Sequence, residues 1–436
     1  MKSILITLFA ILMWCSPAIS PEPAPWREIK KSPRIEKLEK EIKQGDSGAA
    51  NRFWNEMKLQ GTPLIEAIPE DRNHVQLTFL YRSQGSTKSV VLLAQLYVDD
   101  NRDDSLRVMT RLLDTDIWYK SYWIRSDMRF SYSFVPNPTP QSLGNNPDLH
   151  PGDPLNPKSL TTGTNVGNSV VELPDALPQR WIISDDHIPH GRIEEEQIES
   201  KVLKTSRRAW IYTPPGYDRS RESRYPLLVC FDGWVYSRAE FVATPTILDN
   251  LIAAKKIPAM IALFVDQAPQ PQRNIELTND DLFLEYVANE LLAHVRQKWR
   301  ITSDPSQTVV CGSSTGGLAS AFFAFRRPDA FGNVLSQSGA FWPGRNRSDP
   351  QHEWLTTQIQ SAPRVAVRFV LQVGILETGG PTPFNGPSIL KTNRHLRDVL
   401  IAKGYPVDYQ EVAGGHEPLS WRGGLAEGLI SLMSAH

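Results

Sequence analysis

The segment Thr308–Gly317, TVVCGSSTGG, constrains the fold of this 436-residue chain more than any other. It contains GSSTG at Gly312–Gly316, which is the only G-x-S-x-G pattern in the sequence. A β-branched apolar run precedes the pattern, and the helix-forming stretch Leu318–Phe331 follows it. A serine between small residues at a strand-to-helix turn is typical of a nucleophile elbow. The alternative is a Gly/Ser turn that only packs a helix on a strand.

The chain around this turn, residues 177–436, alternates apolar runs with helical stretches. Buried parallel strands are covered on both faces and therefore read as continuous apolar runs. Seven such runs occur: AWIYTP, PLLVCF, AMIALFVD, TVVCGSS, NVLSQS, RFVLQVG and DYQEV. Between them, Thr278–Trp299 predicts a helix, with Thr278 and Asp281 as a capping box. Strands that alternate with helices predict an α/β domain with a mostly parallel sheet over residues 177–436.

Residues 1–20 have the composition of a secretory signal peptide. Lys2 is followed by the apolar run Ile4–Cys15, which is too short for an ordinary membrane span, and small residues follow. The sequence therefore predicts a periplasmic or secreted protein. An uncleaved membrane anchor and a lipoprotein modified at Cys15 are the alternatives.

Two further regions separate this signal from the α/β domain. Residues 21–65 form a charged lead-in, which favours one short amphipathic helix or a solvated segment. Residues 66–176 begin with short aromatic and β-branched runs that partly alternate, as in a small β-sandwich. They end in a stretch rich in Pro, Gly and Asn, residues 136–175, which favours a linker.

Composition excludes several classes of function. Lys and Arg number 47 and Asp and Glu number 48, so the formal net charge of −1 gives no attraction for nucleic acid. His187 and His190 are close in sequence but lack a third ligand at zinc-like spacing, so we expect no metal. We expect no membrane contact beyond the signal segment. Cys230 and Cys311 are expected as buried core residues, and a bridge between neighbouring strands stays open, as does the oligomeric state.

Ser314, at the centre of the pattern, requires a proton acceptor to act as a nucleophile. In this class of fold the order along the chain is Ser, acid, His. His416 is the best-placed base, because it lies in the Gly-rich stretch VAGGH after the last apolar run. The other histidines after the serine are His352, His395 and His436, and an ordinary loop histidine is the alternative for His416.

Glu377 is the best candidate for the acid that orients the imidazole. It lies three residues after the end of the penultimate apolar run, RFVLQVG. Asp398, Asp408 and Glu411 are its rivals, and an exposed loop carboxylate is the alternative for Glu377 itself.

Two backbone N–H groups are candidates for an oxyanion hole. Thr315 follows the serine at the expected start of a helix, where N–H groups lack an intrahelical acceptor. Trp234 follows Asp232-Gly233 after another apolar run, in the position of the second donor. A plain β-turn at Asp-Gly is the alternative.

These residues lie in a C-terminal part, residues 205–436, that resembles the enterochelin esterases, a group of esterase D-like α/β-hydrolases. The matching stretches are WIYTPPGY at 210–217, DG at 232–233, RNIEL at 273–277, GSSTGG at 312–317, SQSG at 336–339, GGH at 414–416 and WRGGL at 421–425. The upstream region, with DPLNP at 153–157, is similar to the N-terminal module of that family. This chain has Glu417-Pro418 where the family usually has Asp and a residue other than Pro.

The resemblance implies an α/β-hydrolase fold preceded by a smaller β-sandwich domain. It implies a serine esterase that hydrolyses the ester bonds of a catecholate siderophore trilactone, with Ser314, Glu377 and His416 as nucleophile, acid and base. No cofactor is implied, and a ferric ion would belong to the ligand.

The resemblance also implies roles in substrate binding. Arg273 would meet an anionic catecholate, and Trp421 or Trp342 would wall the pocket. The alternative for Arg273 is a surface ion pair with Glu276. Ser338 ends an apolar run but lacks the flanking glycine pattern of a nucleophile elbow, so we expect no role for it.

Two other functions stay open. An exported esterase acting on feruloyl or acetyl groups of carbohydrates would fit the abundance of Trp and the predicted export. A non-catalytic ligand-binding protein on a hydrolase scaffold would need no serine, carboxylate and histidine set.

Overall fold

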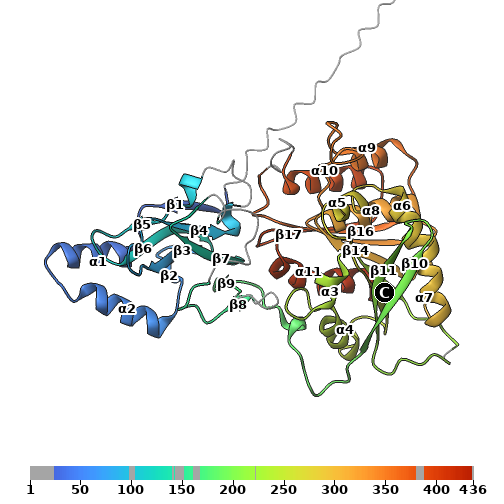
Figure 1. Ribbon diagram of the computed structural model, residues 1–436, viewed down its shortest axis with the longest axis horizontal. Helices are drawn as coiled ribbons and strands as arrows, with labels where there is room; N and C mark the ends of the chain where they lie inside the picture. Colours follow the sequence, from blue (N-terminus) through green and yellow to red (C-terminus); the bar gives the residue numbers. More distant parts are fainter. Residues whose placement is uncertain are drawn as a thin grey trace, which may run out of the picture.

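The computed structural model describes residues 24–97, 104–139, 142, 152–160, 167–220, 222–379 and 387–434. The predicted signal segment and His436 lie outside the described residues. We call residues 24–176 the N-terminal module and residues 177–434 the C-terminal domain. The two parts lie side by side (Figure 1).

An eight-stranded sheet forms the centre of the C-terminal domain within the described residues, in the order β10-β11-β13-β12-β14-β15-β16-β17. Pairing is antiparallel from β10 to β13 and parallel from β13 to β17. The predicted α/β fold is confirmed, and each of the seven apolar runs contains a strand. The strands are β10 (Arg192–Ser200), β11 (Thr205–Thr213), β12 (Leu227–Cys230), β13 (Ile261–Val265), β14 (Thr308–Ser313), β15 (Asn333–Gln337), β16 (Arg368–Gly374) and β17 (Val407–Val412).

Helices cover both faces of this sheet and enclose two apolar cores. One core includes side chains of α3 (Gly233–Ser237), α4 (Thr244–Ala253) and α11 (Pro418–Met433). The other includes side chains from the opposite layer of helices. These are α6 (Asp281–Glu285), α7 (Leu292–Lys298), α8 (Thr315–Arg326), α9 (Trp354–Ser361) and α10 (Ile389–Ala402). A short helix, α5 (Gln272–Glu276), precedes α6.

The helix expected at Thr278–Trp299 begins later than predicted. Its cap is Asp280, whose carboxylate accepts from the Phe283 N–H at 2.6 Å. The Thr278 hydroxyl instead donates to the carbonyl of Asn274, so the predicted capping box is wrong. A π-helical turn, Tyr286–Leu291, separates α6 from α7.

Cys230 and Cys311 face one another in register on β12 and β14, and both thiols are buried and free. The expectation of buried core residues is confirmed. Burial raises the pKa of the Cys230 thiol well above its ordinary value, because the core disfavours a thiolate.

Antiparallel sheets form the N-terminal module, as predicted for a β-sandwich. One sheet, in the order β1-β6-β3-β2 with β5 paired to β6, packs its aromatic side chains against those of a second, β4-β7-β9-β8. Parts of the expected linker form β8 and β9, because the backbone of β9 pairs with β7 and that of β8 pairs with β9. The strands are β1 (Trp26–Ile29), β2 (Leu64–Ile68), β3 (Asp71–Arg82), β4 (Val90–Ala94), β5 (Thr110–Arg111), β6 (Ile117–Arg125), β7 (Arg129–Pro136), β8 (Ser159–Leu160) and β9 (Asn168–Glu172).

The lead-in is more ordered than the sequence predicts. It contains β1 and the helices α1 (Pro33–Lys43) and α2 (Ala49–Gln60), instead of one short helix or a solvated segment. Phe53 and Trp54 of α2 are buried in a core with strand residues of the module. Burial of these large side chains holds the helices on the sheet.

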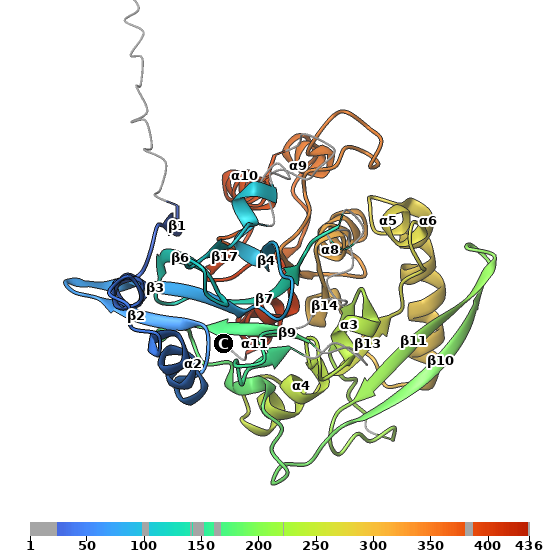
Figure 2. The same ribbon diagram turned by 60° about the vertical axis from the view of Figure 1, so that its left-hand side comes forward.

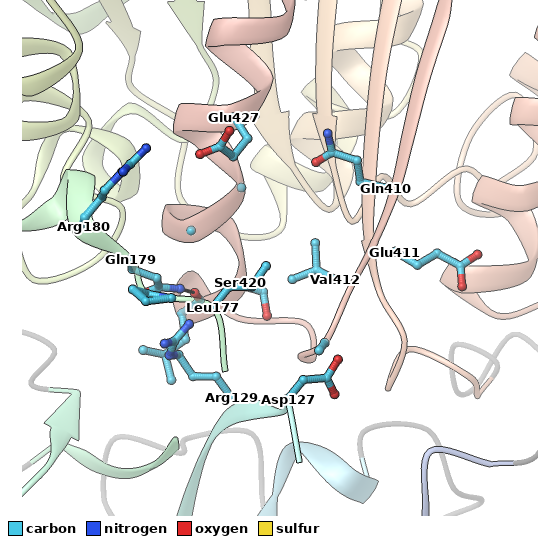
Figure 3. Close-up of a pocket in the computed structure, with 15 residues that line it drawn as sticks. Asp127, Arg129, Leu177, Gln179, Arg180, Gln410, Glu411, Val412, Ser420 and Glu427 are labelled. Atoms are coloured by element: carbon cyan, nitrogen blue, oxygen red, sulfur yellow. Dashed lines mark hydrogen bonds between the residues drawn. The ribbon is translucent and has the colours of Figure 1, made fainter. Parts of the chain in front are cut away.

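The module contacts the C-terminal domain along β7, which lies next to β17 and α11 (Figures 1 and 2). A cavity of about 590 Å³ lies at this boundary, between Arg129 of the module and Val412 of the domain (Figure 3). In the part of the chain that the structure describes, no helix has the length and apolar character needed to cross a bilayer.

Candidate active site

Ser314 occupies a strained turn between β14 and α8. Its φ of 57° and ψ of −124° lie in a region that costs a side-chain-bearing residue about 1–3 kcal/mol. The Ser314 N–H donates to the carbonyl of Gln337, and its carbonyl accepts from the N–H of Ala340. A Cβ on Gly312 would lie 2.6 Å from the backbone of Gly316, so this turn tolerates no side chain there. The strand–turn–helix arrangement expected for a nucleophile elbow is therefore present.

Glu377 and His416 are joined by a hydrogen bond of 2.7 Å between Oε2 and Nδ1. Glu377 follows β16, and His416 lies in the loop between β17 and α11. Only 1% of Glu377 is exposed, and its Oε1 accepts from the Gly374 N–H at 2.7 Å. A carboxylate held in this way fixes the imidazole with its proton on Nδ1, leaving Nε2 able to accept a proton.

Three of the rival acids and bases are paired with other residues. Glu411 is paired with Arg394, Asp398 with Arg397, and His395 with Glu353.

Ser338, for which the sequence analysis expects no role, contacts the candidate acid. Its hydroxyl donates to Glu377 Oε1 at 2.6 Å and accepts from the indole N–H of Trp421 at 3.0 Å. It follows Gln337, which accepts from the Ser314 N–H, so one short segment links the serine turn to the acid. Its position could have indicated this contact, because Ser338 directly follows strand β15 at the sheet edge where Ser314 and Glu377 also follow strands.

Trp421 contacts the ring of His416 and is linked to the acid through Ser338. Its ring meets the His416 ring edge to face, with centroids 5.4 Å apart and planes at 90°. It belongs to the first turn of α11. The residue expected as a pocket wall therefore contacts both the histidine and the serine that is bonded to the acid.

Arg273 is bound to the turn that carries the second oxyanion candidate. Its Nε and Nη2 donate to the two carboxylate oxygens of Asp232 at 2.6 and 2.5 Å, and its Nη1 donates to the Thr315 hydroxyl at 2.8 Å. Glu276 is paired with Arg207, so the alternative ion pair proposed for Arg273 is wrong in its partner. Burial lowers the pKa of Arg273, but the Asp232 carboxylate outweighs it and leaves the pKa above its ordinary value.

This ion pair brings together the two helix starts expected to supply N–H groups. Asp232 is the N-cap of α3, with a left-handed φ of 53°, and Trp234 is the second residue of that helix. Thr315 is the first residue of α8. First-turn N–H groups have no intrahelical acceptor, so both helix starts offer donors to an anion.

Trp342 is buried two residues beyond Ala340, which is bonded to the serine turn. The guanidinium of Arg347 lies over its ring, 5.0 Å from the centroid. Burial lowers the pKa of Arg347, and the charge of Arg273 lowers it further. The two arginines are therefore close enough to repel one another electrostatically.

The described residues contain no group of three or more His, Cys, Asp or Glu side chains that could hold a metal ion. The arrangement of serine turn, imidazole, buried carboxylate and helix starts suits acyl transfer through a serine.

Two family models match this chain. The Esterase model covers residues 200–432, and the model described as "Enterochelin esterase, N-terminal" covers residues 76–182. The iron(III) enterobactin esterase of Dickeya dadantii (strain 3937) is 30% identical over 88% of this chain and 92% of its own length. Both parts of the chain are therefore similar to known proteins.

Solved structures give the same result. The ferric enterobactin esterase of Salmonella typhimurium matches with a TM-score of 0.72 at 28% identity, over 88% of this chain and 98% of that one. The enterobactin esterase of Shigella flexneri, solved in the presence of enterobactin, matches with a TM-score of 0.68 at 28% identity. That match covers 86% of this chain and 96% of the Shigella chain.

Proposed function

This chain belongs to the enterochelin esterase family, and on that premise we propose that it hydrolyses the ester bonds of a catecholate siderophore trilactone such as enterobactin. It is a carboxylic ester hydrolase. The observation that carries the mechanism is the 2.7 Å hydrogen bond between His416 and the buried Glu377, close in the fold to the strained Ser314 turn. A protein that only binds its ligand has no use for this combination.

In the proposed reaction, Ser314 Oγ attacks an ester carbonyl carbon while His416 Nε2 takes the hydroxyl proton. The carbonyl oxygen becomes an anion, which the N–H groups of Thr315 and Trp234 stabilise. The ester C–O bond then breaks, and the leaving alkoxide takes the proton from His416. Water then gives a proton to the same nitrogen and attacks the acyl carbon. The bond between that carbon and Ser314 Oγ breaks, Oγ takes the proton back from His416, and the carboxylic acid leaves. Glu377 stabilises the imidazolium at both steps.

The substrate side of this proposal rests on two arginines and two tryptophans. Arg347 stacks on Trp342, and a guanidinium beside an aromatic face suits a catechol ring with anionic oxygens. Asp232 largely neutralises Arg273, so we assign the first contact with those oxygens to Arg347 and a supporting one to Arg273. Trp421, beside His416, would form another wall.

Product analysis tests the substrate. We expect the enzyme, given ferric or iron-free enterobactin, to release the linear trimer first and then shorter esters and monomer. Feruloylated and acetylated sugars should react more slowly by about 100-fold in kcat/KM, because their alcohols lack catechol rings. Chromatography of timed samples measures both. Faster turnover of a feruloylated sugar would contradict the siderophore assignment and favour the carbohydrate esterase.

Export is a separate proposal that rests on residues 1–20. We propose that a signal peptidase removes this segment and that hydrolysis takes place outside the cytoplasm. Mass spectrometry of the mature protein should find a new N-terminus near Ala18 to Pro21. A mature protein that retains Met1 would contradict cleavage.

A further inference from the structure

The loop that carries His416 is bound to the N-terminal module. We call Ala413–Glu417 the histidine loop. The His416 N–H donates to Gln95 Oε1 of the module at 3.2 Å. A Cβ on Gly415 would lie 2.8 Å from that oxygen and 2.9 Å from the Gln95 Cβ, so the close approach requires glycine. The loop therefore packs against the module at its centre.

Glu417 fastens the end of the histidine loop to β7. Its Oε1 accepts from the Ser131 N–H at 3.0 Å, and its Oε2 accepts from the Ser131 hydroxyl at 2.5 Å. Glu417 is 4% exposed. At the start of the loop, the Arg129 N–H donates to the Ala413 carbonyl at 3.0 Å. The module thus holds both ends of the loop as well as its centre.

The acid loop is anchored to the same module. Ile375 and Leu376, directly before Glu377, are buried in the module core with Phe79 and Phe130. The Leu376 N–H donates to the Gly414 carbonyl at 3.1 Å, which joins the acid loop to the histidine loop. Beside these contacts, the 590 Å³ cavity separates module and domain (Figure 3). The two loops are therefore a main bridge between the parts.

We infer that the N-terminal module is a positioning element for the reaction: Ser131, acting through Glu417, and Gln95, acting through the His416 backbone, keep the imidazole aligned. This inference rests on the proposed role of His416 as the base. An error of about 1 Å in the position of a reacting group can lower the rate by about 100-fold. Gln95, Ser131 and Glu417 are positioning residues, because none of them is placed at the reacting atoms.

The charge of Glu417 gives this inference a second readout. Burial raises the pKa of Glu417 to about 7, while the Ser131 hydrogen bonds and the charges of Arg422 and His416 act to lower it. Arg129 and Glu172 of the module act in turn on Arg422. Because the coupling between two charges is mutual, an ionised Glu417 favours the protonated imidazole of His416. With that pKa, Glu417 is about half ionised at pH 7 and increasingly neutral below it. Removing its charge should therefore make the base available at slightly lower pH, with the largest effect near pH 7.

The test compares four variants of the full chain on an aryl ester and follows thermal unfolding of each. E417A should lower kcat by about 10- to 100-fold with KM nearly unchanged. E417Q can keep both hydrogen bonds if the Ser131 hydroxyl accepts from the new amide, so kcat should be largely restored. The acidic limb of the pH profile of kcat/KM for E417Q should move slightly to lower pH. S131A should lower kcat less than E417A.

Ser121→Ala is the matched control, since Ser121 is another buried module serine, bonded to Thr78 on neighbouring strands. It should lower the unfolding temperature and leave kcat unchanged. Wild-type kcat in E417A, an E417Q as slow as E417A, or equal loss of kcat in S121A and S131A would each overturn the inference. Ser314→Ala, assayed in parallel, separates the two proposals, because its failure to lose activity would instead refute the serine mechanism.

Discussion

Replacement of Ser314 by alanine is expected to lower kcat by about 10⁴- to 10⁶-fold, the loss typical when a serine hydrolase loses its nucleophile. The reason is chemical: without Oγ, no acyl-enzyme can form, and the helix-start N–H groups and binding alone remain. Alanine keeps the strained backbone of the turn, so the fold should persist. Initial rates on an aryl ester and labelling by a fluorophosphonate probe measure the effect.

Ser313→Ala is the matched control, because Ser313 is the buried neighbour at the end of β14. It should retain activity and labelling. Full activity in S314A would refute the mechanism. A wild-type protein that folds but neither labels nor hydrolyses esters would favour the non-catalytic binding protein.

Glu377→Gln should lower kcat by about 10³- to 10⁴-fold. A carboxamide can donate to His416 Nδ1, which would place the imidazole proton on Nε2, the atom that must accept the serine proton. In the opposite orientation, the amide nitrogen would face the Gly374 N–H and the Ser338 hydroxyl, which both donate to Oε1 in the wild-type protein. KM should change little, because Glu377 is buried behind the histidine.

Glu411→Gln provides the comparison for that variant. Glu411 is the nearest rival acid in sequence to the histidine loop; it lies on β17 and is paired with Arg394 of α10. Its kcat should stay within about threefold of wild type, as for most exposed ion pairs. Comparable losses in E377Q and E411Q would mean that Glu377 does not orient the base.

The parts of the fold that the sequence predicts are those fixed by local pattern. Continuous apolar runs identify the parallel strands, since burial on both faces leaves no room for alternation. Gly312 and Gly316 identify the turn around Ser314, because only small residues fit there. The order of the chain singles out Glu377 and His416, which the structure joins by a hydrogen bond.

What the sequence does not predict depends on contacts between distant segments. Ser338 gains its place only because β15 and β16 are neighbours and bring it to Glu377. Arg273 has Glu276 within one helical turn, yet it pairs with Asp232, 41 residues away in sequence. The hydrogen bond between Ser131 and Glu417 joins residues 286 positions apart in the sequence, and no local pattern predicts it. The charged residues in the sequence of α2 suggest a solvated segment, although Phe53 and Trp54 of this helix are buried in the module.

At Ser314, thermal stability and catalytic activity make opposite demands on the residue. A glycine would occupy φ 57°, ψ −124° with less steric cost, so the most stable form of this turn lacks the hydroxyl. Directed evolution that selects for thermal stability alone should therefore favour glycine at this position and yield an inactive protein. A screen that scores product formation after heating keeps the serine and moves stabilising changes to other sites.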